Sequence, residues 1–248
     1  MILNFDGIKN GRELGGIKTA CGKSVKPNLL IRTAELSKAS DNDIATLSSQ
    51  FKLYAVIDFR DSSEYSDAPD RDVPNAIHYS LPAMPNTPEG DELNRCIELF
   101  KTDPIGAYAM LYRMMVISEY TMSIYRKFFD VLLKADGRAV LWHCTQGKDR
   151  TGIAAYLLLS ALGADEKDIL SEYFLTNDAM KPEYDMICKT LPPEQIKPMY
   201  AYTFVHKECF GEFIGAVNEK FGGVMNYLHN CIKLTDAEIE KLRSAYTE

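Results

Sequence analysis

The segment WHCTQGKDRTG at residues 142–152 places a thiol, a lysine, an aspartate and an arginine in one short turn. It continues the apolar run RAVLWHC (138–144), which is typical of a strand, and leads into TGIAAYLLLSALG (151–163), which is typical of a helix. A helix N-terminus presents unpaired backbone N–H groups and the positive end of the helix dipole. The turn is therefore predicted to bind an anion, and a phosphate suits the fork of Arg150.

Cys144 lies at the base of this predicted cradle and is the candidate nucleophile. The local field is expected to stabilise its thiolate, and a thiolate below a ring of donors is suited to attack on phosphorus. The predicted reaction proceeds through a phosphocysteine intermediate. The Thr151 hydroxyl could donate to the thiolate as it departs. The residues expected to bind the substrate phosphate are Thr145, Gln146, Gly147, Lys148 and Thr151.

Apolar runs alternating with helical patterns predict an α/β fold. Strands are expected at 29–34, 53–59, 76–82 and 138–144, and helices at 40–51, at 104–135 with a break near 118–121, and at 151–163. We expect a single domain over residues 1–248. Its mainly parallel sheet of four to five strands is flanked by helices, and its C-terminal half is helical.

Loops and helix ends are predicted from polar segments, proline and glycine. Residues 60–75 are expected to form a polar loop and residues 85–93 a mobile surface loop. After residue 165, helical pieces are expected to be separated by Pro182, Pro192, Pro193, Pro198 and Gly222–Gly223. The last helix has a capping box formed by Thr235 and Glu238.

Composition argues against several classes of function. The net charge of −7, from 28 Lys and Arg against 35 Asp and Glu, disfavours nucleic acid as a partner. The six cysteines include no CxxC pair and no zinc-type spacing, so no metal is expected. The chain shows neither a secretory signal nor an apolar run of transmembrane length. A cytoplasmic location is the default expectation, with export without a standard signal left open, and nothing in the sequence sets the oligomeric state.

The loop HCTQGKDRTG matches the HCxxGKDRTG loop of a family of bacterial tyrosine phosphatases, known as the tyrosine/serine or atypical lipid class. The resemblance covers nearly the whole chain and includes the segments NGRELGGIKT, LLIRTAELSKASDND, YAVIDFRDSSE and GGVMNYLHNCIKLTDAEIEKLR. The chain departs from the family at Gly11, usually aromatic, and at Glu13, usually Asp. The resemblance implies a protein tyrosine phosphatase fold with no metal or organic cofactor. It also implies phosphorylated proteins or phosphoinositides as substrates.

The oxygen that leaves the phosphate needs a proton from a general acid. Many tyrosine phosphatases use the aspartate of a Trp-Pro-Asp loop, but the only tryptophan here is Trp142, beside His143 and Cys144. Asp149 is the candidate acid, and the resemblance implies the same role; alternatively its carboxylate holds loop N–H groups in place. The rival acids are Asp58, Asp61, Asp91 and Asp103.

Several other polar residues have two interpretations. Lys148 could bind a second phosphate of a phosphoinositide or lie on the surface as a solvated lysine. His143 is expected to orient the loop rather than donate a proton. Arg12, Arg32 and Arg60 could reach the substrate, although structural salt bridges are the commoner role.

Three alternative functions remain open at this stage. A phosphate-binding module without turnover would lack the nucleophile or the acid, yet Cys144 and Asp149 are both present. A sulfurtransferase would also use a thiolate in a backbone cradle. A phytase-like phosphatase acting on soluble inositol phosphates would need a strongly basic pocket, whereas this chain is acidic overall.

Overall fold

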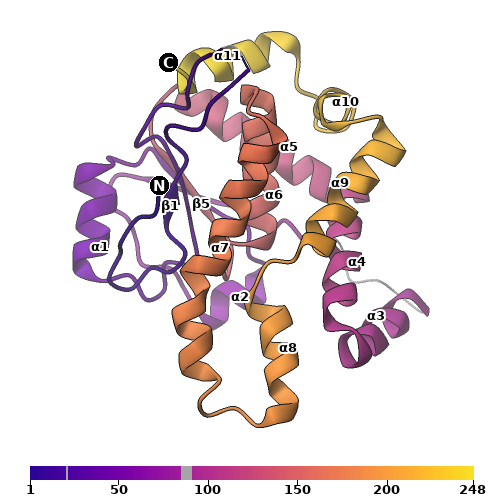
Figure 1. The fold of residues 1–248 in the computed structure, drawn as a ribbon. Helices are drawn as coiled ribbons and strands as arrows, with labels where there is room; N and C mark the ends of the chain where they lie inside the picture. Colours follow the sequence, from indigo (N-terminus) through magenta and orange to yellow (C-terminus); the bar gives the residue numbers. More distant parts are fainter. Residues whose placement is uncertain (21, 85–90) are drawn as a thin grey trace.

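The computed structural model describes residues 1–20, 22–84 and 91–248. Within those residues lies a five-stranded sheet with the strand order β1-β2-β5-β3-β4 (Figure 1). Neighbouring strands are parallel except for β1 and β2, which are antiparallel. The strands are β1 (Arg12–Glu13), β2 (Leu30–Thr33), β3 (Ala55–Asp58), β4 (Ile77–Ser80) and β5 (Val140–His143). The predicted mainly parallel α/β sheet is confirmed, and β1 is the strand that the pattern did not reveal.

Successive residues of the central strands enter two different hydrophobic layers, because side chains alternate across a sheet. Val140 and Trp142 of β5 belong to the larger layer, with residues of α5 and α6. Leu141, between them, belongs to the smaller layer with Leu47 and Phe51. The central strands β2, β3 and β5 are therefore buried on both faces, which explains why they appear as apolar runs in the sequence, whereas the edge strand β4 is mostly exposed.

Helices account for most of the remaining chain. The short α1 (Asp41–Ala45) continues as a π-helical segment η1 (Thr46–Gln50). The helices after it are α2 (Ser62–Asp67), α3 (Asp91–Thr102), α4 (Pro104–Ile117), α5 (Glu119–Ala135), α6 (Asp149–Leu162), α7 (Glu166–Ile187), α8 (Pro193–Thr203), α9 (Lys207–Phe221), α10 (Val224–Asn230) and α11 (Asp236–Tyr246). Across the described ranges, none of these is both long and apolar enough to span a membrane.

Two predicted helix boundaries are confirmed by their capping hydrogen bonds. The predicted break between α4 and α5 lies at Ser118, whose side chain accepts a hydrogen bond from the N–H of Thr121. At the start of α11, the capping box of Thr235 and Glu238 is formed in both directions.

Other sequence predictions were wrong. Residues 60–75 contain helix α2, which Asp61 caps, and α3 begins at Asp91, inside the segment expected as a loop. The rest of that expected mobile loop, residues 85–90, lies outside the described residues. Pro182 and Pro198 lie inside α7 and α8 instead of separating helices.

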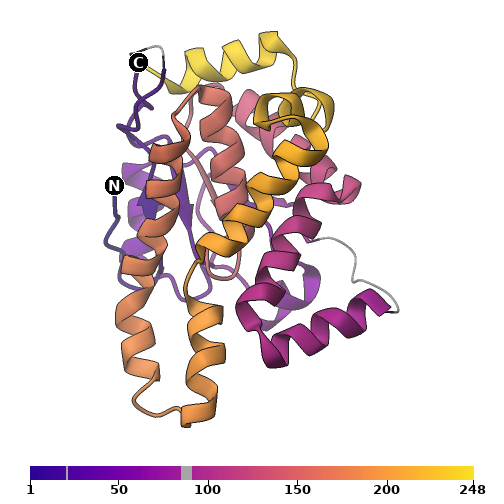
Figure 2. The same cartoon turned by 45° about the vertical axis from the view of Figure 1, so that its right-hand side comes forward.

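Packing between α7 and α8 accounts for the two internal prolines. A proline removes one intrahelical hydrogen bond, a cost that tertiary contacts can offset. Tyr184 of α7 packs on Tyr200 of α8 and on Phe204, with ring centroids 6.0 and 4.8 Å apart. Both views show the two helices side by side and extending beyond the sheet (Figures 1 and 2).

Candidate functional site

The loop of residues 144–148 connects β5 to α6, so the predicted strand–turn–helix order is confirmed. Helix α6 begins at Asp149, two residues before the predicted start. Gly147 has a φ of 65°, and a Cβ placed on it would lie 2.1 Å from the carbonyl oxygen of Thr33. A side chain would therefore push the loop away from the end of β2.

The carbonyl groups of this loop are held on its outer side. The carbonyl of Thr145 accepts a hydrogen bond from the N–H of Glu35, and that of Gln146 accepts one from Asn10 Nδ2 at 2.8 Å. The carbonyl of Gly147 accepts one from Arg32 at 2.8 Å. Because the C=O of one residue and the N–H of the next point in opposite directions, the N–H groups of Gln146, Gly147 and Lys148 face inward.

These inward N–H groups are available to an anion. Within the described part of the chain, the backbone N–H groups of residues 145–148 donate to no protein acceptor. Cys144, only 2% exposed, lies at the base of the loop, and Arg150 follows in the first turn of α6. The arrangement is an anion cradle at a helix N-terminus with a thiol beneath it.

Two of the residues that hold the loop carbonyls, Asn10 and Arg32, depend on one buried carboxylate, that of Glu172 in α7. Its two oxygens bind Arg12 Nε at 2.7 Å and an Arg32 terminal nitrogen at 2.6 Å. Arg12 also donates to Asn10 Oδ1, which positions the amide that binds Gln146. Burial and then the charge of Arg32 lower the pKa of Arg12 to about 10, despite the opposing effect of Glu172.

Arg150 forms a two-pronged ion pair with Glu64 of α2, with distances of 2.6 and 2.7 Å. Thr145 Oγ1 donates to the same carboxylate at 2.5 Å. Burial would raise the pKa of Glu64, but Arg150 and the hydrogen bond from Thr145 outweigh it and lower that pKa to about 2. The pair fixes the plane of the guanidinium at the rim of the cradle.

Glu64 is a residue that reasoning about function from the sequence missed. Two signals pointed to it: its place in the segment YAVIDFRDSSE and the capping-box spacing from Asp61. Neither signal identifies Arg150 as the partner, because the two residues lie 86 positions apart.

Asp149 and Lys148 both contact aromatic side chains. Asp149 Oδ1 accepts a hydrogen bond from the hydroxyl of Tyr112 at 2.7 Å. Lys148 is 2% exposed, donates to the carbonyl of Phe204 at 3.2 Å and lies over the ring of Tyr108. The interpretation of Lys148 as a solvated surface lysine is therefore wrong, because its ammonium group is enclosed between α4 and the end of α8.

A cavity of about 160 Å³ opens above Cys144. Its polar lining consists of cradle residues and Glu64, and its apolar wall comes from α4, Met84 and α8. The lining residues are Glu64, Met84, Tyr108, Leu111, Tyr112, Met115, Cys144, Thr145, Gln146, Asp149, Arg150 and Tyr202. Five predicted site residues thus meet around one cavity, whereas Gly147, Lys148 and Thr151 are not part of the lining found in the described structure.

Thr151 differs from the expectation in its contacts. Its hydroxyl is buried and has no hydrogen-bond partner within the described residues, so the expected bond to the Cys144 sulfur is not made in this conformation. The carbonyl of Thr151 accepts a hydrogen bond from the Trp142 indole at 3.2 Å, which ties the first turn of α6 to β5.

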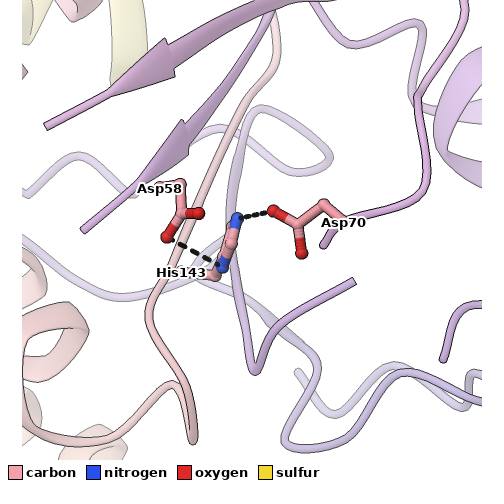
Figure 3. A group of neighbouring side chains, drawn as sticks. All are labelled: Asp58, Asp70 and His143. Carbon is pink, nitrogen blue, oxygen red and sulfur yellow. Dashed lines mark ion pairs between the residues drawn. The ribbon is translucent and has the colours of Figure 1, made fainter. Parts of the chain in front are cut away.

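Below the loop, His143 lies between two carboxylates (Figure 3). Its Nδ1 is 3.7 Å from Asp58 and its Nε2 is 3.1 Å from Asp70. One ligand atom from each of the three residues lies within 4.8 Å of the others, close enough to consider a metal site. A terminal nitrogen of Arg60, however, is 2.9 Å from both carboxylates and compensates their charge, so an ion-pair network fits these residues better.

The rival acids and the three arginines have structural contacts. Asp58 pairs with Arg60, Asp61 caps α2 and Asp103 caps α4. The side chain of Asp91 lies outside the described residues. Arg12, Arg32 and Arg60 are fully buried in salt bridges, the commoner of their two predicted roles.

Comparison with known proteins agrees with the resemblance seen in the sequence. The model of the tyrosine phosphatase family matches residues 3–248. A Cupriavidus necator protein, provisionally named a tyrosine-protein phosphatase, is 28% identical over 249 residues, which cover 98% of this chain and 88% of that one. The triple specificity protein phosphatase PtpB of Mycobacterium tuberculosis is 27% identical over 286 residues, 98% of each chain. A tyrosine-protein phosphatase of Nostoc commune is 25% identical over 235 residues, 90% of this chain and 76% of that one.

Replacing Glu172 should destabilise both the fold and the loop. Glu172→Gln keeps the size of the side chain but leaves the charges of Arg12 and Arg32 uncompensated in the interior. Breaking a buried pair in this way typically costs about 3–5 kcal/mol. We expect a loss of this size in the free energy of unfolding, measured by urea denaturation, together with loss of phosphatase activity.

Glu183→Gln on the same helix is the matched control. Glu183 pairs with Lys9 at the surface, where both side chains are partly exposed, and such pairs contribute at most about 1 kcal/mol. Equal urea midpoints for the Glu172 variant and the unchanged protein would show that the loop does not depend on this carboxylate.

Proposed function

The chain belongs to the tyrosine phosphatase family, and we propose that it hydrolyses phosphotyrosine through a phosphocysteine intermediate on Cys144. The observation that carries the proposal is the cradle of inward N–H groups with a thiol at its base and Arg150 at its rim. Family membership also favours phosphoryl transfer over the sulfur-transfer alternative.

In the first step the Cys144 sulfur attacks phosphorus and the bond from phosphorus to the tyrosine oxygen breaks. The loop N–H groups and Arg150 bind the equatorial phosphate oxygens, where negative charge is spread in the transition state. In the second step water attacks phosphorus, the bond between sulfur and phosphorus breaks, and phosphate is released with the thiolate restored.

Asp149 is proposed as the group that moves the proton in both steps. It lines the cavity, at the start of the helix that carries Arg150. The structural contacts of Asp58, Asp61 and Asp103 leave it as the best placed of the described carboxylic acids. Asp149 protonates the departing tyrosine oxygen and then accepts a proton from the attacking water.

The cavity wall supports an aromatic leaving group. Tyr108, Leu111 and Met115 give it an apolar side against which a phenyl ring can pack. Within its lining, Arg150 is the single cationic side chain, faced by Glu64 and Asp149. A polyphosphorylated inositol would need more positive charge, so both phosphoinositides and soluble inositol phosphates are poorer candidates.

The nucleophile is tested by Cys144→Ser, assayed with para-nitrophenyl phosphate. We expect turnover to fall by orders of magnitude, because a serine hydroxyl lacks the reactivity of a thiolate, while vanadate still binds in the intact cradle. Cys209→Ser is the control, since Cys209 is equally buried and only donates to the carbonyl of Ile105. Turnover close to normal in the Cys144 variant would refute the phosphocysteine mechanism.

The substrate class is tested by comparing kcat/KM on phosphotyrosine, phosphoserine and phosphothreonine peptides and on mono- and polyphosphorylated phosphoinositides in vesicles. Packing of the ring on the apolar wall should favour phosphotyrosine by about tenfold or more. A preference for a polyphosphorylated lipid would overturn the assignment of the substrate but leave the chemistry at Cys144 intact.

The acid is tested by Asp149→Asn, which retains shape but cannot transfer this proton. A general acid contributes about 10²–10⁴-fold, and most when the leaving group is poor. The variant should lose about 10²-fold or more on a phosphotyrosine peptide and much less on para-nitrophenyl phosphate, whose leaving group departs readily as an anion. The fall in rate at high pH should also disappear, because an acid is active only while protonated. Equal losses on both substrates with an unchanged pH profile would mean that Asp149 is structural.

A further inference from the structure

Two buried tyrosines form a hydroxyl pair behind Asp149. Tyr112 comes from α4 and Tyr173 from α7, and each is only 1% exposed. The Tyr112 hydroxyl lies 2.7 Å from Asp149 Oδ1 and 2.7 Å from the Tyr173 hydroxyl. Three side chains from three helices thus form a continuous chain of short hydrogen bonds that ends at the cavity.

The number of protons available to the Asp149–Tyr112–Tyr173 hydrogen bonds determines which group donates in each of them. Tyr112 has one proton for its two partners, and Tyr173 has no other hydrogen-bond partner within the described residues. If Tyr173 donates to Tyr112 and Tyr112 donates to Asp149 Oδ1, both phenol protons are used. A proton on Oδ1 would reverse the order and leave the Tyr173 proton buried without an acceptor, which is unfavourable.

Both phenols keep their protons at the pH where a phosphatase works. Burial first, and then the negative charge of Asp149, hold the pKa of Tyr112 and that of Tyr173 well above the usual value for tyrosine. The two hydroxyls therefore remain donors while Asp149 changes its protonation state during the reaction.

We propose that Tyr112, oriented by Tyr173, is a positioning residue that keeps Asp149 Oδ1 as an acceptor and so places the transferable proton on Oδ2. Within the described residues Oδ2 makes no hydrogen bond, so it can turn to the leaving oxygen in the cavity. The inference rests on the proposed role of Asp149 and adds to it which oxygen carries the proton and what holds the carboxylate.

Among the described residues, no other group near Asp149 can take the place of the hydrogen bond from Tyr112 to Oδ1. The Lys148 ammonium lies 3.7 Å from Oδ1, beyond hydrogen-bond distance, and is already bound to the carbonyl of Phe204. The other described groups whose pKa is shifted by the charge of Asp149 are Arg150, Tyr108, Tyr125, Tyr202, His206 and Cys209. Tyr112 alone among the described side chains donates a hydrogen bond of normal length to the carboxylate.

The test is Tyr112→Phe, which removes one hydroxyl and keeps the ring. On a phosphotyrosine peptide we expect kcat to fall by about tenfold, the effect of one hydrogen bond to a charged group, with a smaller fall on para-nitrophenyl phosphate. The high-pH limb of the rate profile should move to higher pH, because losing this donor makes the ionised carboxylate less favourable. Tyr173→Phe should change both readouts in the same direction by less, because Tyr112 can still donate to Asp149.

Tyr227→Phe is the matched control, because Tyr227 is also fully buried and its hydroxyl donates to the α4 carbonyl of Val116. It should lose stability without changing either the dependence on the leaving group or the pH limb. In the double variant of Asp149→Asn with Tyr112→Phe, the tyrosine change should add almost nothing to the dependence on the leaving group, because Tyr112 acts through Asp149.

The results separate this inference from the proposed function. If Asp149→Asn shows the expected dependence on the leaving group but Tyr112→Phe and Tyr173→Phe slow both substrates equally with an unmoved pH limb, the positioning role is overturned and Asp149 remains the acid. If Asp149→Asn shows no such dependence, the assignment of the acid fails and this inference fails with it. Thermal unfolding of each variant identifies any loss that comes from misfolding, and Tyr173→Phe remains informative if Tyr112→Phe does not fold.

Discussion

The ion pairs of the Glu172 carboxylate are the interaction on which the shape of the loop of residues 144–148 depends. This carboxylate neutralises Arg12 and Arg32, two guanidinium groups that are fully buried beneath the loop. Through Arg32 it holds the carbonyl of Gly147, and through Arg12 and Asn10 it holds that of Gln146. A buried ion pair of this kind stabilises little in itself, but removing one partner is costly. Its contribution is geometric, since it keeps the carbonyls outside and leaves the N–H groups inside.

The cationic side chains at and near the cavity are likewise held by fixed partners. Arg150 is held by Glu64 from the short helix α2, and the ammonium of Lys148 is enclosed against a backbone carbonyl and an aromatic ring. The cavity therefore offers a substrate one fixed guanidinium and a ring of N–H groups rather than a broad basic surface. This arrangement is compatible with the net negative charge of the chain and with a single phosphate group beside an aromatic ring.

Much of the fold could be predicted because its elements are determined locally. The buried strands appear as apolar runs, Ser118 interrupts a long helical pattern, and Thr235 begins the last helix. Predictions failed where long-range packing outweighs local preference. Pro182 continues through α7 because that helix packs on α8, and α2 forms within a stretch whose composition is typical of a loop.

The sequence by itself determined which chemical groups the candidate site contains, because a thiol, a turn glycine, a carboxylate and an arginine follow one another between a strand and a helix. Those groups are brought together by local backbone geometry, which neighbouring residues control. Only the tertiary structure decided which residues support them. Glu64 pairs with Arg150 across 86 positions, Glu172 reaches Arg12 across 160, and Tyr112 reaches Asp149 across 37. Such contacts depend on how separate helices pack against one sheet, and local sequence patterns do not specify that packing.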